Sequence, residues 1–260
     1  MLLAIDIGNT NITLGLWNGR AWEQQWRLRT VREKTVDEYG IELTSLLQTY
    51  QLTNGPEQVI IASVVPTLNP VFARTSQRYL QKTAVFVHHN LDLGITIKTD
   101  NPAEVGVDRL ANAVAVHNAY PGPGIVLDMG TATKFDIISA AGELCGGVIA
   151  PGLRLAADSL TQRAAQLRGV ALEAPPQVIG TNTVHAIQSG LIFGYVSLIE
   201  GMIARLRAAH PDRERPLRII GTGGQLELLA DHLTFLDIID PWLTLTGLRL
   251  INDRLIKEEG

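Results

Sequence analysis

The sequence has 260 residues, 46% of them hydrophobic and 18% charged, and a formal net charge of −4. This composition is typical of a folded globular protein and excludes a disordered chain, and the length suits one large domain or two of ordinary size. Binding to a nucleic-acid backbone needs clustered Lys and Arg, and the sequence has no such cluster, so we expect no nucleic-acid partner.

Nothing in the sequence indicates export or membrane insertion. Residues 2–5, LLAI, lead directly into Asp6, which excludes the apolar core of a signal peptide. The longest apolar stretch, residues 183–206, is interrupted by polar residues and favours a buried helix over a membrane span. The single cysteine, Cys145, excludes internal disulfides. We therefore expect a cytoplasmic protein with no membrane partner.

The first half of the chain begins with a hairpin and continues as alternating strands and helices. Strands are predicted at residues 2–6 and 11–17, and Asn18-Gly19 is a hairpin turn signal before a third strand. Thr35 and Glu38 form a capping-box pattern for a helix that runs to about Tyr50. The elements that follow are a strand, a helix and a strand, expected within residues 59–65, 66–82 and 84–88. Residues 95–120 are then expected to form a strand, a loop and a helix.

The second half opens in the same way after the PGPG segment at residues 121–124 and continues with helices and strands. Two strands, a Gly142 turn and a third strand open it, followed by helices near 153–167 and 183–210. The remaining elements are a strand, a helix, a strand and a closing helix, expected at residues 217–224, 225–232, 235–239 and 245–257.

The two halves open on the same pattern. Asp6 and Gly8 recur as Asp128 and Gly130, each 122 positions later. We expect an α/β fold of two duplicated domains, residues 1–118 and 119–260, each a mixed sheet flanked by helices, with a cleft between them.

The repeated segments, DIGNTN at residues 6–11 and DMGTAT at 128–133, have the chemistry of phosphate loops. A Gly directly after a strand lets backbone N–H groups approach a phosphate, small polar residues add donors, and a strand-end Asp can hold hydrated Mg²⁺. One copy alone would be better explained by a turn with an Asp cap, which uses the same residues. Two copies favour a nucleotide held between two loops.

Two further segments fit the same chemistry. IIGTGG at residues 219–224 is a strand that ends in a Gly-rich turn, where a flat adenosine could lie against bare backbone, or simply an ordinary strand-to-helix turn. Asp108 and Arg109 open a helix, where an ionised carboxylate is stabilised and could accept a hydroxyl proton during phosphoryl transfer. The alternative for this pair is a helix-start Asp beside a solvated Arg.

Together, DIGNTN, GVDR at residues 106–109, DMGTAT and GTGG resemble the type III pantothenate kinases of the acetate and sugar kinase, heat-shock chaperone and actin superfamily. The resemblance spans nearly the whole chain. It implies two ribonuclease H-like (actin-like) domains with mixed five-stranded sheets, and ATP-dependent phosphorylation of pantothenate as the first step towards coenzyme A.

The resemblance also implies roles for individual residues. Asp108 would be the catalytic base, Asp6 would lie near Mg²⁺, and Asp128 would hold a monovalent cation, K⁺ or NH₄⁺. The residues expected to bind the nucleotide are Asp6, Ile7, Gly8, Asn9, Thr10, Asn11, Ile12, Thr13, Thr131, Gly221, Gly223 and Gly224. Those expected to bind pantothenate are Gly106, Val107, Asp108, Arg109 and, from the second subunit of a homodimer, Thr183.

The chain departs from the family pattern at three positions. Thr99 stands where Tyr is frequent, which puts one pantothenate contact in doubt, and Arg168 stands where Pro is frequent. Lys134 follows the second loop where a small polar residue is common, and either adds charge near the phosphates or extends from a strand edge. Two other functions stay open: a non-catalytic regulatory protein of this family, and a kinase of the superfamily with another small acceptor.

Overall fold

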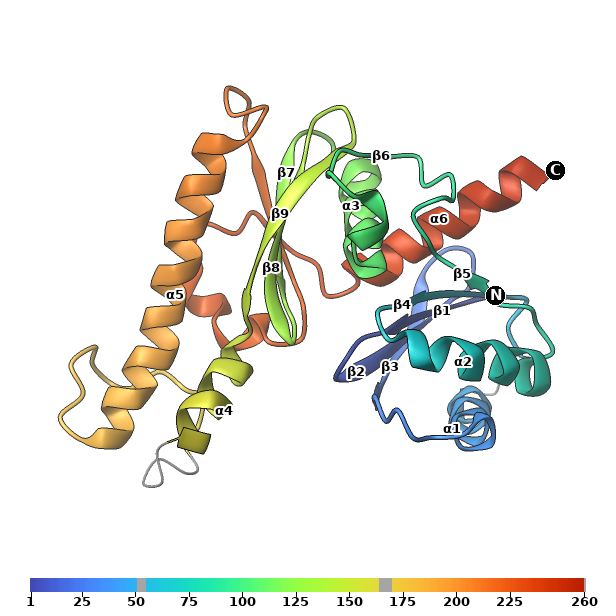
Figure 1. Ribbon diagram of the computed structural model, residues 1–260, viewed down its shortest axis with the longest axis horizontal. Coiled ribbons are helices and arrows are strands. Elements are labelled where there is room, and N and C mark those ends of the chain that lie inside the picture. The colour runs from blue at the N-terminus through green and yellow to red at the C-terminus, as the bar shows by residue number, and fades with distance from the viewer. Residues whose placement is uncertain (51–54, 164–169, 260) are drawn as a thin grey trace. The chain divides into compact units, whose positions relative to one another are not determined.

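The computed structural model describes residues 1–50, 55–163 and 170–259. Arg168 and the end of the helix expected over 153–167 lie outside the described residues. The chain divides into two compact units, the first formed by Met1–Ala119 with Trp242–Gly260 and the second by Tyr120–Pro241. Each unit is built on a sheet with helices (Figure 1).

The first unit contains a five-stranded sheet in the order β3-β2-β1-β4-β5. Its strands are β1 (Leu2–Ile7), β2 (Asn11–Trp17), β3 (Trp22–Arg29), β4 (Gln58–Ser63) and β5 (Val85–Phe86). β1 pairs antiparallel with β2 and parallel with β4. A short strand, β6 (Thr96–Ile97), follows β5 in the chain. The expected opening hairpin and third strand are therefore confirmed.

Helices cover both faces of this sheet. α1 (Val36–Thr49) and α2 (Asn69–Thr75) pack on the face that carries Leu3, Ile5 and Ile7. α3 (Val107–Ala119) and α6 (Leu243–Glu259) contact the other face and each other. Thr35 caps α1 in the expected capping box with Glu38.

The second unit repeats this topology. Its own strands run in the order β11-β10-β7-β8-β9, from β7 (Gly124–Met129), β8 (Ala132–Ile138), β9 (Glu143–Pro151), β10 (Arg218–Thr222) and β11 (Ile238–Ile239). β7 pairs antiparallel with β8 and parallel with β10, as β1 does with β2 and β4. Even the register shifts match, at Leu16/Trp17 in β2 and Ile137/Ile138 in β8. The duplication read from two short motifs thus extends through both sheets.

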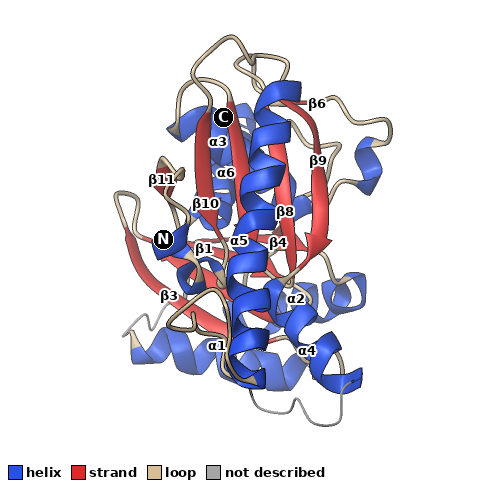
Figure 2. Cartoon of the chain, turned by 90° about the vertical axis from the view of Figure 1, so that its left-hand side faces the viewer, coloured by secondary structure: helices blue, strands red, loops and turns tan. Residues whose placement is uncertain are grey.

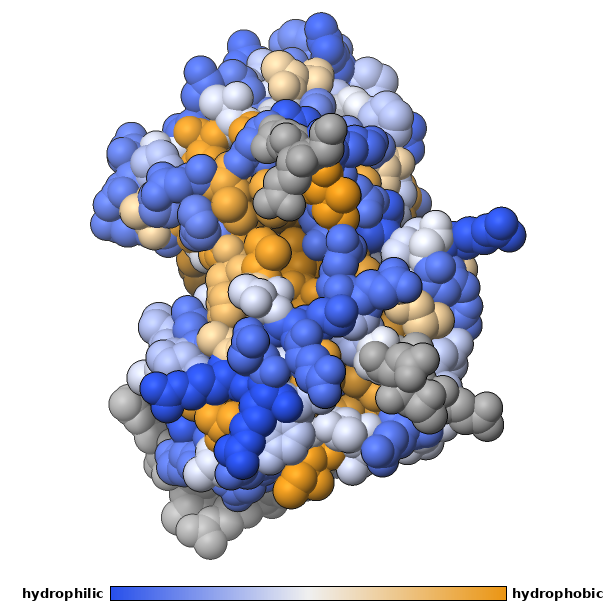
Figure 3. Space-filling model, turned by 90° about the vertical axis from the view of Figure 1, so that its right-hand side faces the viewer, coloured by the Kyte–Doolittle hydropathy of each residue, from blue (hydrophilic) through white to orange (hydrophobic). Residues whose placement is uncertain are grey.

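α5 (Thr183–Ala209) packs along one face of the second sheet, as Figure 2 shows, and α4 (Leu153–Arg163) follows β9. Within the described residues, α5 alone is long and apolar enough to cross a membrane by length and composition. This is weak evidence for a span, because a core helix of a soluble protein passes the same test, and seven α5 residues are buried. The face drawn in Figure 3 mixes hydrophilic and hydrophobic residues.

Two expectations from the sequence are wrong. Its place in the chain predicts that the closing helix belongs to the second half, yet α6 belongs to the first unit, because its buried leucines pack on α3 and the first sheet. Residues 225–232 form two 3₁₀ turns, Leu226–Leu228 and Ala230–His232, not an α-helix. Leu226 and Leu229 are both buried, and a spacing of three residues suits the 3₁₀ period.

Candidate active site

The first loop lies where β1 ends and β2 begins. Ile7 pairs with Ile12, and the Gly8 N–H donates to the Asn11 carbonyl at 3.0 Å, which closes a tight turn. Asn9 and Thr10 are exposed at its tip. The predicted strand-turn-strand loop is therefore present, with its polar residues accessible to a ligand.

Two residues that the motif reading missed hold this loop. Thr30, just after β3, donates its hydroxyl to the Gly8 carbonyl at 2.6 Å and its N–H to the Thr10 carbonyl at 3.0 Å. Arg32 donates to the Asn9 side chain at 3.1 Å. Both lie about twenty residues from the motif, and only the pairing of β3 with β2 brings them to it. Arg32 adds a positive charge beside the loop tip.

Asp6 lies on the face of the first sheet that α3 and α6 cover. Side chains alternate along a strand, so Ile5 and Ile7, which pack with α1 and α2, direct Asp6 to the opposite face. Thr13 stands directly across the ladder from Asp6. The carboxylate is half-buried at the end of its strand.

Asp108 reaches the same edge of the first sheet. β1 and β4 are parallel, so their carboxyl ends lie side by side, and the Val64 N–H after β4 donates to the Ile7 carbonyl at 3.0 Å. Gly106, at the start of α3, lies against Val64: a Cβ built there would be 3.7 Å from Val64 Cγ1. The structure thus brings the first loop and the GVDR segment to one edge of one sheet.

The Asp108 carboxylate is held at the start of α3. Its Oδ1 accepts the Arg109 N–H at 2.9 Å, and the side chain curls over Gly106, where an added Cβ would lie 2.6 Å from Oδ1. Both Asp108 and Arg109 are half-buried. The carboxylate is therefore fixed in position at the start of the helix.

The second loop is at the corresponding place in the second unit. Met129 pairs with Thr133, and the Gly130 N–H donates to the Ala132 carbonyl at 3.0 Å, so this turn is one residue shorter than the first. Thr131 is exposed at the tip. Thr133 matches Ile12 in the ladder and is fully buried, so it is a packing residue and not part of the loop surface.

Tyr195 of α5 supports this loop from beneath. Its hydroxyl donates to the Pro151 carbonyl and lies 2.8 Å from the Thr133 hydroxyl. Burial raises the pKa of Tyr195, and the Thr133 hydrogen bond partly offsets that rise. The phenol therefore stays protonated and able to donate.

The Gly-rich turn after β10 packs against the second loop. Gly223 has a positive φ of 95°, and a Cβ on it would lie 2.6 Å from Asp128 Oδ1, so only glycine fits. Gly221 is buried beneath Leu226, whereas Gly224 is exposed. Of the three glycines expected to bind adenosine, only Gly224 offers an open surface of the kind that a ring needs.

Gln225, which sequence reasoning missed, ties three segments of this site together. Its backbone N–H donates to Met129 O at 2.9 Å, and its side-chain Nε2 donates to Gly130 O at 2.6 Å. Its Oε1 accepts the Arg154 N–H at 3.0 Å, at the start of α4. The side chain therefore fixes the second loop to α4 and to the turn after β10.

Lys134 and Asp128 form an ion pair. They stand directly opposite each other in the β7–β8 ladder, and Lys134 Nζ lies 2.8 Å from Asp128 Oδ2. This is the same ladder position that Asp6 and Thr13 occupy in the first unit.

Among the described residues, no three His, Cys, Asp or Glu side chains gather closely enough to hold a metal ion by themselves.

Thr183 is exposed in the first turn of α5. The helix is capped by Asn182, whose side-chain oxygen accepts the His185 N–H at 2.9 Å. Thr99, the departure noted in the sequence, is half-buried in the chain between β6 and α3.

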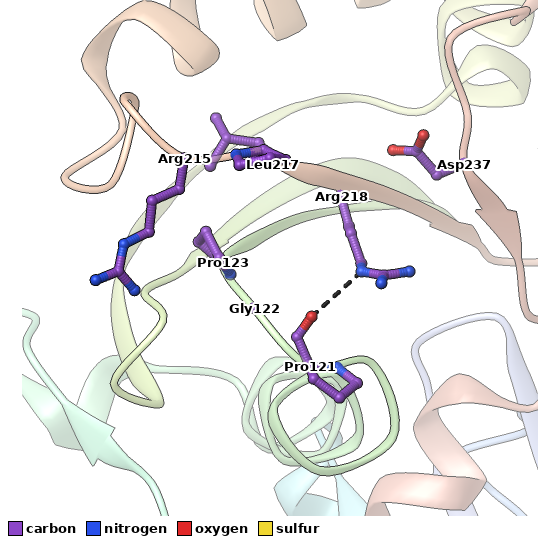
Figure 4. A pocket seen from close by; sticks show the side chains of 8 residues that line it. Pro121, Gly122, Pro123, Arg215, Leu217, Arg218 and Asp237 are labelled. Carbon is purple, nitrogen blue, oxygen red and sulfur yellow. Dashed lines mark hydrogen bonds between the residues drawn. The ribbon is translucent and has the colours of Figure 1, made fainter.

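A pocket of about 480 Å³ in the second unit is not part of this site (Figure 4). It lies between Pro121–Pro123, before β7, and Arg215–Arg218, where β10 begins, and the Arg218 Nε donates to the Pro121 carbonyl at 3.2 Å. Asp128 and Gly223 stand at the opposite ends of these strands. The candidate site is therefore at the strand ends that carry Asp128 and Gly223, and not at this pocket.

Comparison with known proteins identifies the family. The sequence profile described as "Type III pantothenate kinase" matches residues 2–205. A type III pantothenate kinase of Phenylobacterium zucineum is 45% identical over 249 residues, covering 95% of this chain and 96% of that protein. One from Moorella thermoacetica is 43% identical over 255 residues, covering 98% and 99%.

Solved structures agree on the fold. A Baf family transcriptional activator from Campylobacter jejuni is 21% identical, with a TM-score of 0.61 over 98% of this chain and 99% of that one. An archaeal actin homolog is 14% identical, with a TM-score of 0.52 over 97% and 99%. At these identities the likeness shows a shared actin-like fold and nothing about activity.

Proposed function

The chain belongs to the type III pantothenate kinase family, and from this premise we propose how its residues carry out the reaction. It is an enzyme that phosphorylates pantothenate, the first step of coenzyme A biosynthesis. The proposal concerns the phosphoryl donor, the roles of single residues and the assembly.

ATP is the proposed phosphoryl donor, and each unit carries one loop suited to binding its phosphates. The exposed Asn9 and Thr10 in the first unit and Thr131 in the second supply polar contacts. Asp6 suits Mg²⁺ because it is a half-buried carboxylate beside the first loop, and Mg²⁺ is commonly held by one or two carboxylates together with phosphate and water. When bound, Mg²⁺ offsets the negative charge of the phosphates.

Asp108 accepts the proton of the pantothenate hydroxyl as that oxygen attacks the γ-phosphorus. The new O–P bond forms while the bond from the γ-phosphorus to the β,γ-bridging oxygen breaks, and ADP leaves. Arg109 pairs with the carboxylate of pantothenate, and Gly106 and Val107 line the acceptor site beside it. The observation that carries this assignment is the placement of Asp108 at the sheet edge that also carries Asp6 and the first loop.

The experiment compares Asp108→Asn with the unaltered protein in an assay of phosphopantothenate formation. We expect kcat to fall by at least about a hundredfold, the usual contribution of a general base, with ATP affinity unchanged in calorimetry. Asp37→Asn is the matched control, because Asp37 also lies in the first turn of a helix but is exposed. Full activity in Asp108→Asn would refute the assigned role, and a preference for another acceptor would refute the pantothenate site.

A homodimer is the proposed assembly, formed through α5. The helix buries one side against the second sheet and exposes small or apolar residues at intervals of four on another, namely Ala186, Gly190, Gly194 and Leu198. Small residues let two helices approach closely. Thr183 at the start of α5 then contributes to the pantothenate site of the second subunit.

Light scattering tests the assembly. We expect a dimer, and we expect Gly194→Arg to give monomers with weaker pantothenate binding. A monomer at micromolar concentration in the unaltered protein would contradict the proposal.

We also propose a cytoplasmic enzyme with no nucleic-acid or membrane partner, in keeping with the net charge of −4 and the lack of a basic cluster.

A further inference from the structure

The Lys134–Asp128 ion pair joins β7 and β8 at the base of the second loop. The two side chains face each other across neighbouring strands, where opposite charges stabilise the pairing. Lys134 is 15% exposed and Asp128 is 11% exposed, so solvent screens the pair only partly. The other carboxylate oxygen, Oδ1, lies against Gly223.

The first unit offers an internal comparison. There the corresponding aspartate, Asp6, stands opposite Thr13, a neutral hydroxyl. The duplicated strands and their matching register make the two positions equivalent, so the second copy differs by an ammonium group placed on its aspartate. Charge at this position is a property of the second loop and not of the fold.

A free monovalent cation does not fit well beside Asp128. The resemblance to the family implied K⁺ or NH₄⁺ at this carboxylate, yet Lys134 Nζ already lies 2.8 Å from it. Two unit charges about 4 Å apart repel by about 1 kcal/mol in water and about 4 kcal/mol in a partly buried site. The ammonium of lysine also has the same charge as the implied ion and is tethered to the strand.

We propose that Lys134 replaces the monovalent cation, so that this enzyme binds ATP and transfers its phosphoryl group without K⁺ or NH₄⁺. The inference rests on the proposed function, because it assumes that the second loop contacts the nucleotide. The Lys134 ammonium neutralises Asp128, so the phosphates meet a neutral ion pair at the base of the loop instead of a bare carboxylate.

The test varies the cation and the residue together. Affinity for a non-hydrolysable ATP analogue is measured by calorimetry, and kcat/KM by assay, in KCl, NH₄Cl or choline chloride at about 0.1 M, which holds the Debye length near 10 Å. The variants are Lys134→Thr, which copies the residue of the first unit, and Lys134→Met, which keeps the length but lacks charge and oxygen. Lys257→Thr, an exposed lysine in the last turn of α6, is the control.

We expect the unaltered protein and Lys257→Thr to give the same affinity and kcat/KM in all three salts. Lys134→Thr should lose about tenfold in affinity in choline, which corresponds to about 1.4 kcal/mol, and recover in K⁺ or NH₄⁺. Lys134→Met should lose affinity without recovery. Thermal melts in choline show whether each variant is folded before binding is compared.

Several outcomes overturn the inference. It fails if the unaltered protein needs K⁺ or NH₄⁺, or if folded Lys134→Thr binds the analogue as tightly as the unaltered protein in choline, which would make the ion pair a structural contact only. Nucleotide binding that is independent of salt, with no phosphopantothenate formed, would overturn the proposed acceptor but support cation-independent nucleotide binding. Absence of nucleotide binding in every salt would overturn both.

Discussion

Gln225 shows how one side chain can set the geometry of the second loop. The hydrogen bonds that its side-chain amide makes with Gly130 O and Arg154 N would both be lost in Gln225→Ala. Each hydrogen bond contributes about 0.5 to 1.5 kcal/mol. The two bonds together are worth about 1 to 3 kcal/mol, so we expect ATP affinity, measured by calorimetry, to fall by roughly five- to 150-fold.

A second substitution, Gln225→Glu, tests the loss of one of these hydrogen bonds while the other is kept. Gln225→Glu keeps the acceptor for Arg154 but sets a carboxylate oxygen against the Gly130 carbonyl, so it should weaken ATP binding at least as much as alanine does. Gln24 is an exposed glutamine on β3, so Gln24→Ala serves as the control and should leave ATP affinity unchanged. Unchanged ATP affinity in both Gln225 variants would show that the loop holds its shape without this side chain.

The sequence was most informative where function depends on local chemistry. Asp6, Gly8 and Asp108 stand out because a strand end or a helix start is visible in a few residues. Thr30 and Gln225 do not stand out, because their bonds depend on which strands become neighbours. Lys134 departs visibly from the family pattern, but its partner Asp128 follows only from the register of β7 and β8.

The packing of α3 on α6 depends on Gly247. A Cβ at this position would lie 1.9 Å from the Ala111 carbonyl oxygen, which is backbone and cannot turn aside. We expect Gly247→Ala to destabilise the protein by about 1 to 3 kcal/mol, the cost of overpacking, and to lower the melting temperature by several degrees.

Gly201→Ala in α5 is the matched control for this substitution. Its Cβ would meet only the tip of the Arg205 side chain, 3.3 Å away, so alanine should be neutral or stabilising through helix propensity. Equal melting temperatures for Gly247→Ala and the unaltered protein would mean that the two helices separate at little cost.

Helices and strands were predicted where their patterns are long, and the errors fall on short or distant elements. Residues 225–232 contain enough leucine for a helix, but their burial every third residue produces 3₁₀ turns. The existence of α6 was predicted correctly, while its unit was not, because periodicity gives the apolar face of a helix and not the sheet that it covers.

At the scale of the whole molecule, the first unit needs the last residues of the chain. Four α6 side chains, Leu243, Leu245, Leu248 and Ile251, are at most 2% exposed. Their burial contributes about 6 to 12 kcal/mol, as much as the entire stability of many domains. We expect a chain that ends at Pro241 to lose protection from hydrogen exchange in β1 and β4 while β7 and β10 keep theirs.

A chain that ends at Lys257 keeps these four side chains and should match the full-length protein. Mass spectrometry of exchanged peptides from the two sheets distinguishes the outcomes. Native protection of β1 and β4 in the chain that ends at Pro241 would show that the first unit folds without α6. The burial of the four α6 side chains would then contribute much less stability than expected.

A hydrogen bond joins the two points at which the chain enters and leaves the second unit. The Tyr120 hydroxyl donates to Asp240 Oδ2 at 2.9 Å, and burial together with that bond raises the pKa of Tyr120 to about 12. The donor thus keeps its proton at any pH that a cell experiences. Because its entry and exit points are adjacent, the second unit has the topology of a domain inserted into the first, which suits it to excision and expression as a separate domain.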